Sequence, residues 1–218
     1  SYCDTEEQAI IYSEGDNFVF SHNIMDGDQA SLNNETYHWL VVKGNSAVIE
    51  RNTFSKRNNA VKGSVVKLAS SGTAHTVQYN LFSDSQDNSS FDSSLLVLNV
   101  GSTTGTDAAQ SNDFKVQYNR IENFVSGRRV MRVQTSGATI KGNTIVNPNG
   151  AISLEDGGFN TVSDNIIIRE TNLGADSGDR PGGVLITPLG HTVTNNYIAG
   201  TRADGKETGG IVFTANPF

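Results

Sequence analysis

The sequence predicts an all-β fold, a right-handed single-stranded parallel β-helix (solenoid) of about seven coils. Three observations predict it: one short phrase recurs seven times, an apolar strand precedes nearly every copy, and helical periodicity is weak along the chain. The 22 glycines and 4 prolines suit many short strands joined by turns. An antiparallel sandwich is the alternative, and the regular phrase argues against it. We expect residues 1–218 to form a single domain, with residues 1–22 as a cap segment.

The repeated phrase consists of an apolar residue, two variable residues, an asparagine, one variable residue and a second apolar residue. Its asparagines are Asn23, Asn52, Asn80, Asn119, Asn143, Asn165 and Asn196. Neighbouring asparagines are 29, 28, 39, 24, 22 and 31 residues apart, so a bare coil needs about 22 residues and loops hold the excess. We expect the asparagines to turn the chain in the left-handed backbone region. Their side chains should stack in one line and hydrogen-bond from coil to coil.

A third apolar strand per coil is expected upstream of every phrase except the first. The segments are residues 40–42, 65–68, 95–98, 130–133 and 152–154 and Val184–Ile186, and Ile211–Phe213 follows the last phrase. Residues 6–11 could form a short N-terminal helix or cap. Polar loops at 83–94, 102–113 and 169–182 either wall a binding cleft or are plain solvated loops.

The last strand, Ile211–Phe213, begins a new coil shortly before the sequence stops. A terminal coil exposes apolar stacking surface and unpaired backbone groups. We therefore expect a second copy, a neighbouring molecule or further residues to cover this strand, through self-association or as a further domain.

Composition argues against several classes of protein. No apolar run reaches the 18 residues of a membrane-spanning helix and no secretory leader is present, so we expect no membrane partner. The formal net charge of -7 argues against a nucleic-acid partner. Cys3 is the only cysteine, so an internal disulfide cannot form.

Two stretches carry a resemblance to a known family, residues 135–145 (TSGATIKGNTI) and 150–160 (GAISLEDGGFN), continued by residues 182–198. Together with residues 37–40 (YHWL) and 52–59 (NTFSKRNN), they resemble polysaccharide lyase family 6, which includes alginate lyases and chondroitinase B. The resemblance implies β-elimination on a uronic-acid polysaccharide. In this family a lysine is the base, an arginine is the acid, and a cation neutralises the uronate carboxylate. Acidic residues hold calcium in many members.

This sequence departs from the family at each catalytic position. Gln134 stands where the resemblance implies the base, and Glu155 and Asp156 stand where it implies an Arg-His pair. An amide has no usable protonation equilibrium near neutrality, so Gln134 cannot be the base. Arg129 is the nearest match to a calcium-holding carboxylate, so we expect no metal and no cofactor, although the family resemblance by itself implies calcium. The catalytic residues are therefore unknown, and Arg132 is the candidate substitute.

A basic cluster accompanies these positions. The expected substrate-binding residues are Arg128, Arg129, Arg132, Gln134, Lys141 and Glu155. Because side chains alternate along a strand, Arg132, Gln134 and Glu155 should share one solvent-facing sheet surface. The neighbours expected to face the core are Met131, Val133, Ile152 and Leu154. A guanidinium could hold a uronate carboxylate with two hydrogen bonds. The alternative is an Arg132–Glu155 ion pair between coils that holds no ligand.

Three functions remain open. The first is a lyase-like β-helix that binds acidic polysaccharide such as alginate, either catalytically degenerate or as an accessory domain of a larger enzyme. The second is an active alginate or uronate lyase with a non-standard base, and the third is a structural or assembly module. The missing base and acid predict little or no lyase activity, and the basic surface favours binding over pure structure. We expect a secreted or periplasmic protein, in which His38 and His75 are structural.

Overall fold

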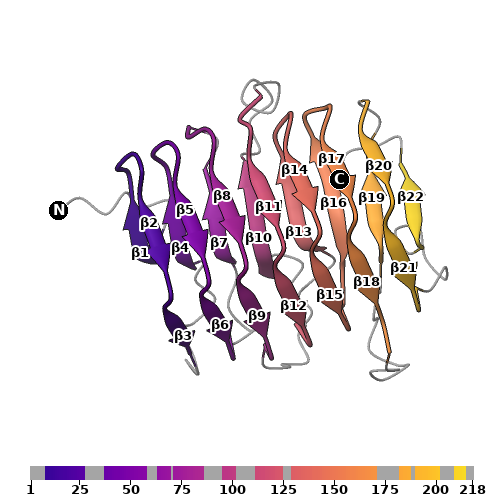
Figure 1. Cartoon of the computed structure of the whole chain (residues 1–218), viewed down its shortest axis with the longest axis horizontal. Helices are drawn as coiled ribbons and strands as arrows, with labels where there is room; N and C mark the ends of the chain where they lie inside the picture. The colour runs from indigo at the N-terminus through magenta and orange to yellow at the C-terminus, as the bar shows by residue number, and fades with distance from the viewer. Residues whose placement is uncertain are drawn as a thin grey trace.

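The computed structural model describes residues 8–27, 37–57, 63–69, 71–85, 95–101, 111–124, 129–170, 182–187, 190–201 and 209–214. These residues form a parallel β-helix, in which every strand pairs in parallel with the equivalent strand of the neighbouring coil. The coils follow one another along the long axis of the molecule (Figure 1). One sheet has eight strands and the other two have seven each, which confirms the predicted all-β class and about seven coils. Within the described ranges, no helix is long and apolar enough to cross a membrane.

Each coil contributes one strand to each of three sheets. Sheet A contains β1 (Gln8–Ser13), β4 (Tyr37–Val42), β7 (Gly63–Leu68), β10 (Leu95–Gly101), β13 (Arg129–Gln134), β16 (Ala151–Asp156), β19 (Val184–Ile186) and β22 (Ile211–Phe213). Sheet B contains β2 (Val19–Ser21), β5 (Val48–Glu50), β8 (Thr76–Gln78), β11 (Lys115–Gln117), β14 (Thr139–Lys141), β17 (Thr161–Ser163) and β20 (Thr192–Thr194). Sheet C contains β3 (Ile24–Asp26), β6 (Thr53–Ser55), β9 (Leu81–Ser83), β12 (Arg120–Glu122), β15 (Thr144–Val146), β18 (Ile166–Ile168) and β21 (Tyr197–Ala199).

The core lies between the three sheets, and in-register pairing fills it with rows of apolar side chains. In sheet A, Met131 pairs with Leu98 on one side and with Ile152 on the other, and all three are buried. Val133 and Leu154 form the next pair of the same inner face. The predicted inward positions of β13 and β16 are therefore confirmed. Each fully buried aliphatic side chain contributes about 1.5–3 kcal/mol, so stacking supplies much of the stability.

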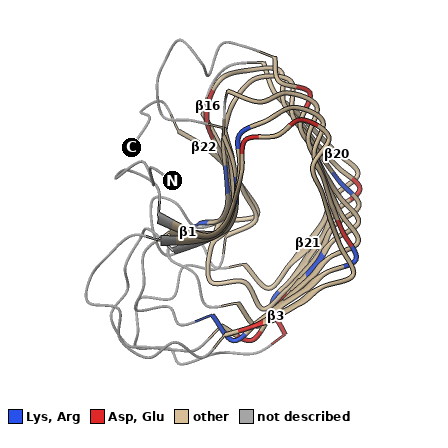
Figure 2. Ribbon diagram, turned by 90° about the vertical axis from the view of Figure 1, so that its left-hand side faces the viewer, with Lys and Arg blue, Asp and Glu red and all other residues tan. Residues whose placement is uncertain are grey.

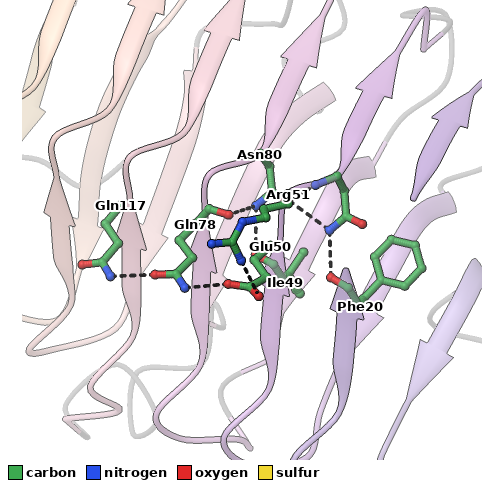
Figure 3. A network of polar contacts seen from close by, with 8 residues as sticks. Phe20, Ile49, Glu50, Arg51, Gln78, Asn80 and Gln117 are labelled. Carbon is green, nitrogen blue, oxygen red and sulfur yellow. Dashed lines mark hydrogen bonds and ion pairs between the residues drawn. The ribbon is translucent and has the colours of Figure 1, made fainter. Parts of the chain in front are cut away.

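The seven predicted asparagines form one continuous ladder at the turn between sheets B and C. Each Nδ2 donates to the Oδ1 of the next asparagine, at distances of 3.2, 3.0, 3.0, 3.0, 3.0 and 2.9 Å from the first pair to the last. Asn80 illustrates the pattern: its Nδ2 also donates to the carbonyl of Ile49 at 2.9 Å (Figure 3). Its backbone N–H donates to Asn119 Oδ1. The predicted stacking of these side chains in one line is confirmed.

The expectation that the asparagine itself adopts the left-handed backbone conformation at this turn is wrong. The residue before the asparagine adopts it. Positive φ angles occur at His22, Arg51, Tyr79, Tyr118, Gly142, Asp164 and Asn195. The asparagine keeps ordinary backbone angles because both its backbone N–H and its amide must reach the same oxygen in the next coil. The position before it faces outward and is free to vary, as the exposed Tyr79 and Tyr118 show, whose rings stack at 5.4 Å.

Polar side chains form a second ladder on the outer face of sheet B. Gln117 Nε2 donates to Gln78 Oε1 at 3.0 Å, and Gln78 Nε2 donates to Glu50 Oε2 at 2.8 Å (Figure 3). Arg51 completes the series with an ion pair to Glu50 at 2.9 Å. Cross-strand pairs of this kind support the register that the asparagine ladder sets.

The expected helix or cap at residues 6–11 is wrong where the structure describes it, because residues 8–13 form strand β1. β1 pairs with β4, with Ile11 opposite Leu40. The backbone partners offered by the second coil outweigh a weak local helix signal. The first coil therefore has the same three strands as the others.

At the opposite end, the side chains of Ile211 and Phe213 in β22 are 48% and 77% exposed. They pair with Val184 and Ile186 of β19 through their backbone. The expectation that another molecule or segment covers this strand stays a prediction. The polar loops at 83–94, 102–113 and 169–182 lie almost wholly outside the described residues.

We expect Asn143→Ala to lower the free energy of unfolding by about 3 kcal/mol, measured by urea denaturation. Asn143 is fully buried; its Oδ1 accepts from the backbone N–H and Nδ2 of Asn119, and its Nδ2 donates to Asn165 and to the carbonyl of Val116. Asn23→Ala is the matched control, because Asn23 is exposed and stands at the end of the ladder. Equal losses in the two variants would contradict the structural role of the ladder.

Candidate functional site

The strands of sheet A bend, and the bend shapes the outer face of the sheet. Val130 and Met131 are consecutive residues of β13, and both are buried. The pairing of β13 with β16 shifts register at this point, between Arg129 and Met131. Figure 2 shows the strands turning so that the outer face is the concave one. Arg129 and Arg132 lie on either side of this register shift, and the side chains of both reach Glu155.

A second irregularity brings an acidic residue to the same place. Val133 pairs with Leu154 but Gln134 pairs with Asp156, so Glu155 is an extra residue that bulges from β16. Thr187, in the next coil, holds the bulge: its Oγ1 lies 2.8 Å from the carbonyl oxygens of both Leu154 and Glu155. Its backbone N–H also donates to the Leu154 carbonyl at 3.0 Å.

Three donors converge on the Glu155 carboxylate. Arg129 Nε donates to Oε1, Arg132 Nε donates to Oε2 at 2.6 Å, and Ser153 Oγ donates to Oε1 at 3.0 Å. The side chain of Glu155 is only 4% exposed, that of Arg129 10% and that of Arg132 30%. A buried carboxylate is stable only with such compensation, and loss of one partner of a buried pair typically costs about 3–5 kcal/mol. We call these four residues the Glu155 clamp.

Gln134 lies beside the clamp, at the end of β13. Its Nε2 donates to Asp156 Oδ2 at 2.9 Å, and only 1% of the residue is exposed. Its Oε1 is buried without a hydrogen-bond partner among the described residues. Gln134 therefore fixes Asp156 but presents no group that could take up a proton.

The structure brings together four of the six residues expected to bind substrate, namely Arg129, Arg132, Gln134 and Glu155. Arg128 lies outside the described residues. Lys141 does not join them: it lies on β14 in sheet B, with its Nζ 3.8 Å from Asp164 Oδ2. The chain turns between β13 and β14, so closeness in sequence does not place Lys141 on the same face.

The expectation of one solvent-facing surface is wrong for Gln134 and Glu155, which are both buried. Arg132 alone of the three is partly exposed. The alternation rule failed here because the bulge and the bend turn side chains of an outer face toward one another. The alternative, an Arg132–Glu155 ion pair between coils, is what the structure contains, with Arg129 as an additional partner.

Sequence reasoning missed Ser153 and Thr187. Ser153 could have been found, because it precedes Glu155 by two positions on the same face of a strand. Thr187 gave no local signal, since it acts on backbone carbonyls of a coil that lies 32 and 33 residues earlier. The register also places Lys67 and Asn99 in line with Arg132 across three neighbouring strands, β7, β10 and β13.

Electrostatics keeps Arg132 cationic. Burial lowers the pKa of Arg132, and the carboxylate of Asp156 opposes that shift. An arginine pKa begins far above neutrality, and Glu155 at 2.6 Å further favours the charged form. Among the described residues, no group of three or more His, Cys, Asp or Glu side chains is placed to hold a metal ion.

Three of the four histidines act as hydrogen-bond acceptors between coils. His38 Nδ1 accepts from the backbone N–H of Ser64 at 2.9 Å, and His75 Nδ1 accepts from Ala47 at 3.1 Å. Burial lowers the pKa of His38 to about 3, with smaller contributions from the cations Lys67 and Arg57. Burial alone lowers the pKa of His75 to about 4.

His191 Nδ1 accepts from the backbone N–H of Asn160 at 3.2 Å, and burial lowers its pKa. Asn160 accepts in the same way from Ala138 at 2.8 Å, so asparagine and histidine fill equivalent positions. These contacts agree with structural roles for the histidines.

Comparison with known proteins identifies solved structures of the same fold. No family model and no curated protein sequence matches this chain. A PL6 alginate lyase solved as a complex with a trisaccharide shares 21% identity and a TM-score of 0.64, covering 81% of this chain and 38% of its own. The PL6 family polysaccharide lyase Pedsa3628 from Pseudopedobacter saltans shares 21% identity and a TM-score of 0.67, over 88% of this chain and 44% of its own.

A mannuronic acid specific polysaccharide family 6 lyase from human gut microbiota shares 16% identity and a TM-score of 0.65, over 95% of this chain and 46% of its own. The chain thus spans less than half the length of each of these enzymes. The predicted resemblance to polysaccharide lyase family 6 is confirmed at the level of the fold.

We expect Thr187→Val to lower the free energy of unfolding by about 1–3 kcal/mol, because the carbonyls of Leu154 and Glu155 lose the single hydroxyl donor that they share. Thr187→Ser keeps the hydroxyl and is the matched control. Urea denaturation of both variants measures the difference. A serine variant as unstable as the valine variant would show that the methyl group, not the hydroxyl, holds the bulge.

The pKa of His75 predicts a loss of stability in acid. Its folded value of about 4 lies below its ordinary value of 6.5, so the unfolded chain binds a proton more readily. The contribution of neutral His75 to the free energy of unfolding is complete above pH 6.5 and declines as the pH falls toward 4, by on the order of 3 kcal/mol.

His75→Asn, which places at this position the residue type that Asn160 provides in a later coil, should remove this part of the pH dependence while keeping an acceptor for the Ala47 N–H. The measurement is the free energy of unfolding of both proteins between pH 4 and about pH 8. Identical pH profiles would contradict the assignment.

Proposed function

We propose that this chain is a polysaccharide-lyase-like β-helix that binds acidic, uronic-acid polysaccharide such as alginate on the outer face of sheet A, and that it does not itself catalyse β-elimination. The observation that carries the proposal is the position of Arg132. Its side chain is 30% exposed, and its Nε donates to Glu155. No described residue bonds its two terminal nitrogens. A guanidinium presented in this way suits a carboxylate of a passing uronate.

A polymer lying along the sheet would meet more than one cation. Lys67, Asn99 and Arg132 stand in register on β7, β10 and β13, where neighbouring strands lie about 4.8 Å apart. Lys67 and Arg132 are thus separated by two strand spacings, about 10 Å. In a chain with a formal net charge of -7, this row is a local basic feature suited to a polyanion.

The geometry argues against catalysis by the family's mechanism. Gln134 has no protonation equilibrium near neutrality, and Glu155 is held in its ionised form by two arginines. Neither residue can replace the base or the acid of β-elimination.

An active lyase with Arg132 as base is the second candidate. Burial lowers the pKa of Arg132, which is the direction a base requires, but Asp156 and Glu155 act in the opposite direction. We therefore favour binding without turnover, by a domain that serves as an accessory to a larger enzyme. The fold likeness to lyases supports a secreted or periplasmic location. Under this proposal, the chain binds the polysaccharide without calcium.

The test is titration calorimetry with alginate oligosaccharides, paired with ultraviolet absorbance for unsaturated uronates on alginate, pectate and chondroitin. We expect binding without absorbance change, and binding that a chelator leaves intact. Arg132→Ala should weaken binding about 10-fold through loss of a charge-assisted contact. Lys141→Ala, which removes a cation of sheet B, is the matched control and should bind as the wild type does.

Two results would contradict the proposal. Turnover that disappears in Arg132→Ala would establish the active lyase instead. Absence of binding to alginate oligosaccharides, together with absence of turnover on all three polysaccharides, would favour the structural or assembly module.

A further inference from the structure

We infer that the carboxylate of Glu155 occupies an anion-binding site formed by Arg129, Arg132 and Ser153, which we call the seat. By occupying the seat, Glu155 limits the affinity of the chain for an external carboxylate. The ligand class of the seat is a single carboxylate, either a small free acid or the carboxylate of a uronate. The inference deepens the proposed function and rests on it only for the identity of the polysaccharide.

The seat differs from the other ion pairs among the described residues. Each oxygen of Glu155 accepts from a different arginine, and Oε1 also accepts from Ser153 Oγ. The carboxylate is 4% exposed. By contrast, Arg120 and Glu122 form a single pair at 2.5 Å on the outer face of sheet C, with side chains 54% and 26% exposed.

The framework of the seat does not depend on the Glu155 side chain. Arg129 and Arg132 project from β13 on the two sides of a bend that buries Val130 and Met131. Thr187 holds the bulge of β16 through backbone carbonyls, not through the carboxylate. Shortening Glu155 would therefore leave a small space between two guanidinium groups and a hydroxyl, without the carboxylate that now fills it. Two buried cations in that position favour capture of an anion.

The occupied seat has a consequence for binding. Glu155 neutralises one of the two arginines and engages Arg132 Nε, so an external carboxylate meets only the outer nitrogens of Arg132. The external carboxylate is also repelled by the negative charge of Glu155, which lies on the other side of the Arg132 guanidinium. Like charges repel more strongly where water is excluded. Glu155 thus lowers the affinity of the chain for acidic ligands and leaves its affinity for neutral sugars unchanged.

The first experiment is chemical rescue of Glu155→Ala by formate. The midpoint of thermal unfolding is measured in sodium formate and in sodium chloride at equal ionic strength. We expect Glu155→Ala to be less stable than the wild type in chloride, and about 100 mM formate to raise its midpoint by roughly 3–6 °C in a saturable way. The wild type should show no formate-specific rise, because its seat is filled. Glu122→Ala, which loses an exposed Glu–Arg pair, is the matched control and should respond like the wild type.

Equal responses to formate and chloride in Glu155→Ala would overturn the inference. So would a variant that fails to fold in formate as well as in chloride, since formate should complete the seat.

The second experiment uses Glu155→Gln, which keeps the volume of the side chain and removes its charge. We expect this variant to bind an alginate oligosaccharide about 10-fold more tightly than the wild type, with the larger gain at low salt. Affinity equal to or below that of the wild type would overturn the restraining role. Should neither protein bind any uronate, the proposed function fails, while the formate rescue still decides whether the seat exists.

Discussion

Parallel pairing of each coil with the next is the constraint on which every other feature of this protein depends. A strand of three residues cannot hold a register by itself, and most strands of sheets B and C have that length. The asparagine ladder fixes the register at one turn, where each buried amide bonds the next coil and a carbonyl of the previous one. Once the ladder is in place, the apolar residues on either side of it must stack on their counterparts.

That register also determines which polar residues meet. Lys67, Asn99 and Arg132 are far apart in sequence, yet they occupy one row of sheet A because their strands pair without a shift. The clamp arises where pairing is irregular: an extra residue in β13 produces the bend, and an extra residue in β16 produces the bulge. Irregularities of this kind are a recognised means of redirecting side chains next to functional sites.

The Glu155 clamp pairs charged side chains of the same chain with one another. Its arginines retain their positive charge, but they direct it at a carboxylate of the same chain. A buried cluster with two cations and one anion is stable only while all its contacts are made, which explains why Ser153 and Thr187 support it so closely. Under the proposed function, the partly exposed edge of Arg132 is the part of the clamp that contacts a ligand.

The sequence by itself determined the fold class, the number of coils, the asparagine ladder and the inward faces of β13 and β16, because these follow from a repeated local pattern. It also identified Arg129, Arg132, Gln134 and Glu155 as residues of one site. Only the tertiary structure decided that Gln134 and Glu155 are buried, that Lys141 lies on another sheet, and that the turn residue precedes the asparagine. The physical reason is that a bend, a bulge and a donor such as Thr187 exist only when coils are stacked, since the groups they join are distant in sequence and carry no shared local signal.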